Sequence, residues 1–319
     1  MIPAHHFARC FRSVVMFIGV MLLACLARPQ AATAVTSKSL VDSSGQTVNI
    51  PRPFKRIISL YVAHTENLCS LGAAEQLVGI GSGDDSPTAV SGKQSYSYRE
   101  DPEKFLAARP DLVLVRPMIE RSYPELINKL RQAGITVVSL QPNTIGEMFE
   151  YWRNLALLTG REQQAEEMIA AFTARLAKVQ DSLKDIPPEQ RPKVYFESIH
   201  GKMKTFAPES IGAYVLEQAG GIHLAADAQQ VRETNIAFYG KERLLSRGEE
   251  IDIYLAQQGK MNPVDRDTIR NEPGFEAIKA VREDRIYLIE EALVSRPTLR
   301  ILDGIEQLHT LFHPLFYKN

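Results

Sequence analysis

The sequence has little cysteine, no excess of charge of either sign, and none of the motifs that mark the common enzyme classes. Its 319 residues include three cysteines, 37 basic residues and 38 acidic residues, which gives a formal net charge of -1. A nucleic-acid binder needs an excess of Lys and Arg to neutralise phosphates, so this balance argues against that class. Cys10 and Cys25 fall in the N-terminal segment, which leaves Cys69 without a partner for an internal disulfide.

Catalytic and phosphate-binding motifs are also lacking. No Gly-x-Ser-x-Gly, Walker or His-Glu-x-x-His pattern occurs. The stretch 79–83, Gly-Ile-Gly-Ser-Gly, comes nearest to a phosphate-binding loop, but it lacks a third glycine at the right spacing and runs into Asp84 and Asp85, which would repel a phosphate. We therefore predict a protein that is not an enzyme and holds no resident cofactor.

The N-terminal segment differs in composition from the rest of the chain. The basic residues Arg9 and Arg12 precede an uninterrupted apolar run over 14–24, and a stretch of small and polar residues follows. The run is shorter than the roughly 20 residues that span a bilayer. This order predicts a signal peptide over 1–34 and an exported protein, in the periplasm or on the outer face of the cytoplasmic membrane.

Two processing sites compete within this segment. Residues 32–34, Ala-Thr-Ala, suit ordinary signal-peptidase cleavage, whereas 22–25, Leu-Leu-Ala-Cys, resembles a lipobox. In the second case Cys25 would be acylated and become the mature N-terminus. A lipid anchor would then be the protein's only link to the membrane.

Two α/β patterns follow, separated by a long helical stretch. Over 38–160 a hairpin is followed by short apolar strands that alternate with amphipathic helices, a pattern that predicts a parallel sheet covered on both faces. Residues 161–186 have an apolar stripe at helical spacing and end at Pro187. The alternation resumes over 187–319. We predict an α/β protein of two Rossmann-like lobes with parallel sheets, joined by one long rigid helix. The expected strands are 56–60, 77–81, 111–115, 136–140, 193–197, 251–256 and 285–289.

Several stretches, in order along the chain, carry a family resemblance. They are 42–59 (Asp-x-x-Gly-x-x-Val-x-Ile-Pro, then Arg-Ile-Ile-Ser), 103–115 (Glu-Lys-Phe-Leu-Ala-Ala-Arg-Pro-Asp-Leu-Val-Leu-Val), 216–221 (Leu-Glu-Gln-Ala-Gly-Gly), 279–287, and 295–297 (Ser-Arg-Pro). From about Asp42 to Pro314 the chain resembles the periplasmic binding proteins of ABC importers for ferric siderophores, cobalamin and haem. His223, where Asn is usual, and Arg247-Gly-Glu-Glu, where Pro-Asp is expected, depart from the pattern.

The resemblance implies a monomeric receptor that captures a metal chelate between its lobes and delivers it to an ABC permease dimer with a cytoplasmic ATPase. It implies that the long helix is a stiff strut and that the lobes close by small angles. It also implies that one acidic residue of each lobe engages arginines of the permease. The residues at these places are Glu103 and Glu242. Glu103 comes two residues after the predicted N-cap Asp101, and Glu242 comes two residues after Gly240. Both carboxylates could instead simply complement a helix dipole.

Candidate ligand contacts follow from the loops after the predicted strands, because ligands of open parallel sheets bind outside the carboxyl ends of the strands. Arginine offers a planar fork for carboxylate, catecholate or phosphate oxygens, and tyrosine offers an apolar ring with a hydroxyl group. The predicted ligand-binding residues are Tyr61, His64, Tyr96, Tyr98, Arg99, Arg116, Glu197, His200, Met261, Asn262 and Arg296.

These candidates point to more than one ligand. Arg99, Arg116 and Arg296 together suit an anionic chelate and favour a ferric siderophore, whereas His64 and His200 could ligate haem iron from opposite lobes. A corrinoid is a further candidate ligand. A receptor of the same fold for a bare metal ion or metal oxyanion is the main alternative, although the sequence has no His-rich loop to recruit a metal. An exported hydrolase on an α/β scaffold is the third hypothesis.

Overall fold

The apolar strands of the first half form one parallel sheet. The computed structural model describes residues 38–83, 88–232 and 234–314, so the predicted signal peptide, its cleavage sites and Cys25 lie outside the described residues. The strands of this half are β1 (Lys38–Val41), β2 (Thr47–Ile50), β3 (Ile57–Ser59), β4 (Leu77–Gly81), β5 (Gln94–Tyr96), β6 (Leu112–Val115) and β7 (Thr136–Ser139). Strands β1 and β2 form the predicted antiparallel hairpin, and the others form a sheet in the order β5-β4-β3-β6-β7.

The helices of this half begin where capping residues and prolines place them. Asp101 accepts a hydrogen bond from the backbone N–H of Glu103 at 3.0 Å, and proline occupies the first position of α3, α4 and α5. The helices are α2 (Val62–Ser70), η1 (Ala74–Gln76), η2 (Thr88–Val90), α3 (Pro102–Ala107), α4 (Pro117–Ser122) and α5 (Pro124–Gln132).

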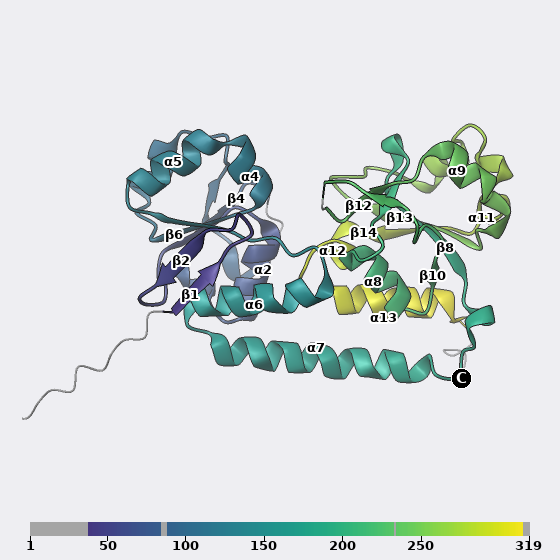
Figure 1. Cartoon of the computed structure of the whole chain (residues 1–319), viewed down its shortest axis with the longest axis horizontal. Helices are drawn as coiled ribbons and strands as arrows, with labels where there is room; N and C mark the ends of the chain where they lie inside the picture. Colours follow the sequence, from purple (N-terminus) through teal and green to yellow (C-terminus); the bar gives the residue numbers. More distant parts are fainter. Residues whose placement is uncertain (1–37, 84–87, 233, 315–319) are drawn as a thin grey trace, which may run out of the picture. The chain divides into compact units, whose positions relative to one another are not determined.

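Two helices, α6 (Ile145–Thr159) and α7 (Glu162–Ser182), follow the first sheet and precede the second. Gly160, with a left-handed φ of 69°, ends α6 and lets the chain turn into α7, which packs alongside it (Figure 1). The buried side chains of α7 recur every three or four residues, as a one-sided helix requires. They are Ala165, Met168, Phe172, Leu176 and Val179. The predicted role of this helix as a rigid strut stays a prediction.

The second sheet is mixed, which corrects the prediction of a purely parallel one. Its strands are β8 (Lys193–Ile199), β9 (Lys204–Phe206), β10 (Ile222–His223), β11 (Gln229–Gln230), β12 (Ile236–Phe238), β13 (Ile253–Gln258) and β14 (Ile286–Glu290). Strands β10, β8, β13 and β14 pair in parallel, whereas β9, β12 and β11 pair antiparallel. The chain reverses from β8 to β9 through a 3-10 turn in which Met203 has a φ of 44°. Strands of two or three residues are too short for a readable hydrophobic period.

The helices of the second half are short except for two that carry a broad apolar face. They are η3 (Pro188–Gln190), η4 (His200–Lys202), α8 (Ile211–Gln218), α9 (Lys241–Ser246), η5 (Gly248–Glu250), α10 (Arg266–Arg270), η6 (Phe275–Ala277), α11 (Lys279–Arg282), α12 (Glu291–Val294) and α13 (Ile301–Phe312). Helices α8 and α13 pack on each other and on α7. Within the described part of the chain, no helix combines the length and the apolar character needed to cross a membrane.

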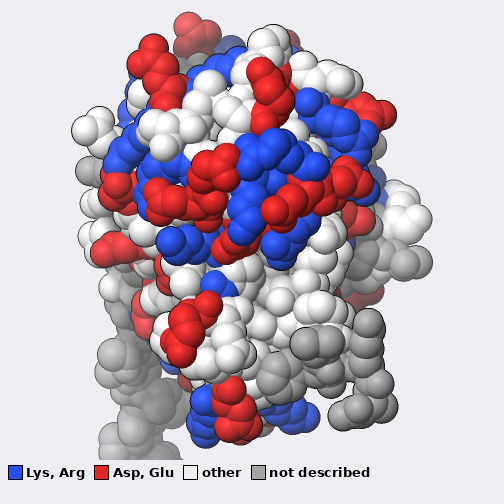
Figure 2. All heavy atoms as spheres, turned by 90° about the vertical axis from the view of Figure 1, so that its right-hand side faces the viewer, with Lys and Arg blue, Asp and Glu red and all other residues white. Residues whose placement is uncertain are grey.

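Surface charge in this half is neutralised locally. Arg247 pairs with Glu250 at 2.9 Å, and Lys279 pairs with Asp252 at 2.8 Å. Figure 2 shows basic and acidic side chains interleaved on the face it presents, rather than separated by sign. The face therefore offers no field of one sign that would attract a polyanion.

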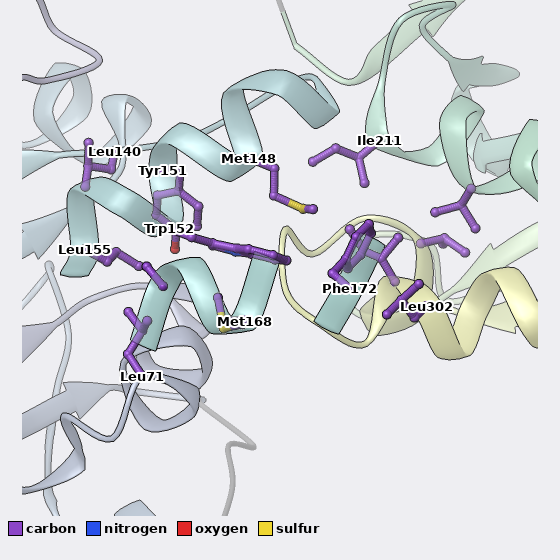
Figure 3. Packing of buried hydrophobic residues seen from close by; sticks show 14 of the residues in the cluster. Leu71, Leu140, Met148, Tyr151, Trp152, Leu155, Met168, Phe172, Ile211 and Leu302 are labelled. Atoms are coloured by element: carbon purple, nitrogen blue, oxygen red, sulfur yellow. The ribbon is translucent and has the colours of Figure 1, made fainter. Parts of the chain in front are cut away.

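One buried cluster joins the two sheets through the helices. Trp152 of α6 is fully buried, and its ring lies 5.6 Å from that of Phe172 of α7 (Figure 3). The same cluster contains Leu71 from the first half and Leu302 from the second. The indole N–H of Trp152 donates to the carbonyl of Pro297 at 3.1 Å, so the packing also satisfies a buried polar group. The position of the two sheets therefore depends on this shared core.

Candidate ligand-binding pocket

A pocket of about 580 Å³ lies where strands of both sheets end. Strands β3, β4, β5, β6 and β7 contribute the residues at or just after their carboxyl ends, and β13 and β14 do the same from the second sheet. Its lining residues are Leu60, Tyr61, Val62, Gly81, Ser82, Gly83, Tyr96, Tyr98, Arg116, Gln141, Thr234, Asn235, Ile236, Lys260, Met261, Glu291, Ser295 and Arg296. This is the edge at which α/β sheets bind ligands.

Arg116 is the most distinctive cation of the pocket. Its guanidinium carbon lies 4.4 Å from the centre of the Tyr61 ring, an arrangement that holds the cation by its attraction to the π face. In the described part of the chain no carboxylate pairs with it, and its buried Nε has no hydrogen-bond partner. Burial raises the pKa of Tyr61, so this phenol stays neutral. A buried donor without an acceptor is costly, and an anionic ligand would supply the acceptor.

Arg296 faces the same pocket but already has a counter-ion. Its Nη1 lies 3.1 Å from Oε1 of Glu66 on α2, and both side chains are close to 10% exposed, at 12% and 10%. Glu66 belongs to the first half of the chain and Arg296 to the segment between α12 and α13. The pair therefore links two distant segments at the pocket wall, and much of the charge of Arg296 is compensated.

A loop after β13 closes another side of the pocket. Lys260 donates to the carbonyl of Gly83 at 2.7 Å, which ties this loop to the loop after β4. The next residue, Met261, is 43% exposed, and its backbone N–H donates to Glu291 at 3.3 Å. Lys260 adds an ammonium group to the two guanidinium groups of Arg116 and Arg296 in the pocket lining. Met261 adds a soft apolar surface that suits a large ligand.

His64 does not line the pocket. It is fully buried, with Nδ1 2.7 Å from the Tyr151 hydroxyl and Nε2 3.1 Å from the carbonyl oxygen of Val115. The carbonyl can only accept, so Nε2 donates to it and Nδ1 accepts from the tyrosine. Burial lowers the pKa of His64 to about 3. Both ring nitrogens are committed, so we leave His64 out of the ligand set proposed below.

Glu197, His200 and Asn262 also lie outside the pocket lining, in a buried network beside it. Nδ1 of His200 lies 2.8 Å from Glu197 Oε2, and the Asn262 amide donates to Glu197 Oε1 at 3.1 Å. The hydroxyl of Tyr254 donates to the same Glu197 at 2.5 Å. Glu197 is thus a fully buried carboxylate with three donors, which explains how its charge is tolerated. The hydrogen bond to Glu197 raises the pKa of His200.

The aromatic loop after β5 lies partly between two pockets. Tyr96 and Tyr98 line the main pocket, and Tyr98 also lines a neighbouring one of about 410 Å³. Arg99 belongs only to the neighbouring pocket, where its Nε donates to the Tyr123 hydroxyl at 3.3 Å. The structure thus brings Tyr61, Tyr96, Tyr98, Arg116, Met261 and Arg296 to one pocket and leaves Arg99 beside it.

The two predicted docking residues are both on the surface. Glu103 lies in the first turn of α3, and Glu242 lies in the first turn of α9. Both side chains are exposed, and neither takes part in an ion pair within the described ranges of the chain. They are therefore available to cations of another molecule.

Some pocket residues were not predicted from the sequence. Lys260 and Glu291 follow β13 and β14, so the rule that ligands bind after strand ends could have found them. By contrast, Asn235 and Ile236 reach the pocket at the start of the antiparallel strand β12. No local sequence pattern predicts strand β12, which has only three residues.

The chain matches the family model described as periplasmic binding protein over residues 57–293. It is 24% identical over 289 residues to the uncharacterized ABC transporter substrate-binding lipoprotein YvrC of Bacillus subtilis, covering 90% of this chain and 88% of that protein. It is also 24% identical over 266 residues to the vitamin B12-binding protein of Vibrio cholerae, covering 82% and 90% respectively.

Among solved structures, it resembles that of a "possible" iron-binding, periplasmic solute-binding protein of Staphylococcus epidermidis. The TM-score is 0.69 at 27% identity, over 81% of this chain and 98% of that one. The family model covers well over half of the chain, and its members bind ligands rather than convert them. The chain belongs to the periplasmic binding protein family that includes receptors for iron, siderophores and cobalamin, and it is the substrate-binding component of an ABC importer.

Proposed function

We propose that this receptor captures an anionic metal chelate, with a ferric siderophore as the leading class, in the pocket of about 580 Å³. The observation that carries the proposal is the state of Arg116. Its guanidinium is stacked on Tyr61, is not paired with a carboxylate among the described residues, and keeps an unsatisfied Nε. Catecholate or carboxylate oxygens of a chelate match the planar donor fork of arginine.

The rest of the lining supports a large, partly aromatic ligand. Tyr61, Tyr96 and Tyr98 add ring area with hydroxyl groups, and Met261 adds a polarizable side chain. The volume lies within the range of pockets that bury drug-sized molecules. In this proposal Arg116 and Lys260 bind the negatively charged groups of the ligand. Arg296 mainly forms part of the pocket wall through its ion pair with Glu66.

Relatives of this chain bind ligands of other kinds, so we retain other chelates as second candidates for the pocket. One is a vitamin B12-binding protein, and a solved structure is of a protein described as a possible iron binder. A corrinoid fits the aromatic lining without needing Arg116. A bare metal ion is less well supported, because among the described residues no three His, Cys, Asp or Glu side chains gather to hold one.

We further propose that Glu103 and Glu242 dock the receptor on its permease, one from each half of the chain. Both are exposed, lie in first turns of helices, and lack ion-pair partners in the part of the chain described. Arginines of a permease dimer would complete the pairs, which would set orientation and association rate.

Export remains a proposal for the same protein. We place it in the periplasm or on the outer face of the cytoplasmic membrane, on the strength of the N-terminal sequence pattern. The relative YvrC carries the description lipoprotein, which supports acylation at Cys25 over cleavage after Ala34.

A binding panel tests the ligand proposal. Thermal unfolding would be followed with ferric tris-catecholate and ferric tris-hydroxamate chelates, cyanocobalamin, haem and bare metal ions. A ligand at 100 times its dissociation constant should stabilise the protein by about 2.7 kcal/mol. A ferric chelate should give the largest shift. A response only to a bare ion would replace the proposal with a metal-ion receptor.

The variant Arg116→Gln sharpens the test. Removing one member of a buried charge contact typically costs 2 kcal/mol or more, so affinity for the ferric chelate should fall by about 30-fold or more. The matched control is Arg121→Gln, an exposed arginine on α4 outside the pocket, which should leave affinity unchanged. Unchanged affinity in Arg116→Gln would remove Arg116 from the ligand contacts.

A further inference from the structure

The network behind the pocket contains a histidine with one uncommitted nitrogen. His200 lies in the turn η4 at the end of β8, and its Nδ1 is bonded to Glu197. Its Nε2 is buried and has no hydrogen-bond partner, although Glu272 Oε2 lies 3.5 Å away. A neutral imidazole that donates from Nδ1 presents a lone pair to this second carboxylate. Protonation at Nε2 would replace that repulsion with an attraction.

The charged groups around His200 favour its protonated form. Glu197 faces it from β8 and Glu272 from the segment after α10, while the ring edge of Phe275 lies on a third side, with centroids 6.2 Å apart. Tyr254 from β13 reaches only the shared carboxylate, and Lys241 from α9 pairs with Glu272 at 2.6 Å. Two carboxylates and one ammonium give a net charge of minus one, which an imidazolium would cancel.

The same network holds the loop that borders the pocket. The backbone N–H of His200 donates to Asn262 Oδ1 at 2.8 Å, and the Asn262 amide donates to Glu197 and to the carbonyl of Gln257 at 2.8 Å. Asn262 directly follows Lys260 and Met261 in the chain. The position of these two pocket residues therefore depends on contacts made by η4 and Glu197.

We propose that His200 is a positioning residue whose protonation fixes Asn262, and with it the loop that presents Lys260 and Met261 to the pocket. The inference rests on the proposed function only for its consequence, which is that ligand capture responds to pH. At a pH below the pKa of His200, the imidazolium contacts both Glu197 and Glu272 and so bridges the two carboxylates. At a higher pH, the neutral imidazole loses its attraction to Glu272, and this bridge is broken. The raised pKa of His200 puts this change above pH 6.5.

The test needs no ligand. Methionine methyl groups of the purified protein would be labelled with ¹³C and followed by NMR from pH 5.5 to 8.5. Met203, three residues after His200, should report the protonation itself, and the methyl of Met261 should shift with the same midpoint. Met148, buried in the core of the first half, is the internal control and should not follow.

Two variants separate the steps. In Asn262→Ala, Met203 should still titrate while Met261 no longer follows, because the link between η4 and the loop is cut. In Glu272→Gln, a mild change at a partly exposed site, both midpoints should move to lower pH. A wild-type Met261 that stays still while Met203 titrates would overturn the proposal, as would the absence of any His200 titration. Neither result would bear on whether the pocket binds a chelate.

Discussion

Tyr61 follows strand β3, His64 lies in the first turn of the next helix, α2, and Arg116 follows the neighbouring strand β6. All three were expected at the ligand. Their surroundings show which of their polar atoms are free to bind a ligand. Arg116 keeps a donor without an acceptor beside the ring of Tyr61, whereas both nitrogens of His64 are used by Tyr151 and Val115. Sequence position alone could not distinguish the two cases, because the partners of His64 come from 51 and 87 residues further along the chain.

The buried His64 makes a prediction about acid stability. Its pKa is about 3 in the folded protein and 6.5 when unfolded, so the unfolded chain binds the proton first. Its contribution to the free energy of unfolding is complete above pH 6.5 and is lost as the pH falls from 6.5 towards 3. The loss should approach about 1.4 kcal/mol for each pH unit.

Urea unfolding at pH 6.5, 5.5 and 4.5 measures this effect. In His64→Gln the amide can serve the same two partners without titrating, so its free energy of unfolding should fall less steeply over this range. Equal slopes in the two proteins would show that His64 takes up its proton without unfolding.

At the scale of elements, the helix pair α6–α7 was predictable and the second sheet was not. Long amphipathic helices repeat their apolar face many times, and Gly160 marks the break between these two. Strands β9 and β12 contain three residues each and pair antiparallel, so neither their length nor their periodicity identifies them. Their place is decided by β8, the neighbour that gives β9 a hydrogen-bonding edge.

Trp152 joins these elements, so its truncation should be costly. It is fully buried among residues from both halves and donates to Pro297. We expect Trp152→Ala to lower the free energy of unfolding by about 3–5 kcal/mol, measured by urea denaturation. Lys178→Ala, an exposed change on α7, is the control and should stay within about 0.5 kcal/mol. A loss below about 1 kcal/mol in Trp152→Ala would contradict the shared core.

At the scale of the whole molecule, each half contributes one of the two proposed docking residues. If Glu103 and Glu242 engage the permease, the double variant Glu103→Lys/Glu242→Lys should bind ligand normally. It should stimulate the ATPase of the reconstituted importer only at a receptor concentration about tenfold higher or more, because both charge pairs are reversed.

The control for that experiment reverses two other exposed glutamates, one from each half. Glu75→Lys/Glu276→Lys makes the same change in net charge at sites where we propose no docking. Equal loss in both double variants would mean that net charge, rather than the two proposed positions, governs the encounter with the permease.

The sequence by itself determined the fold class, the order of most strands and helices, and the family. These depend on hydrophobic period, on caps and on short motifs, which are local properties. It also placed Tyr61, Arg116, Met261 and Arg296 after strand ends, where the pocket lies. Only the tertiary structure decided which side chains face the pocket. It paired Arg296 with Glu66, put His64 in the core, and set Glu197, His200 and Asn262 behind the wall. These outcomes depend on contacts between residues far apart in the chain, and local patterns do not record them.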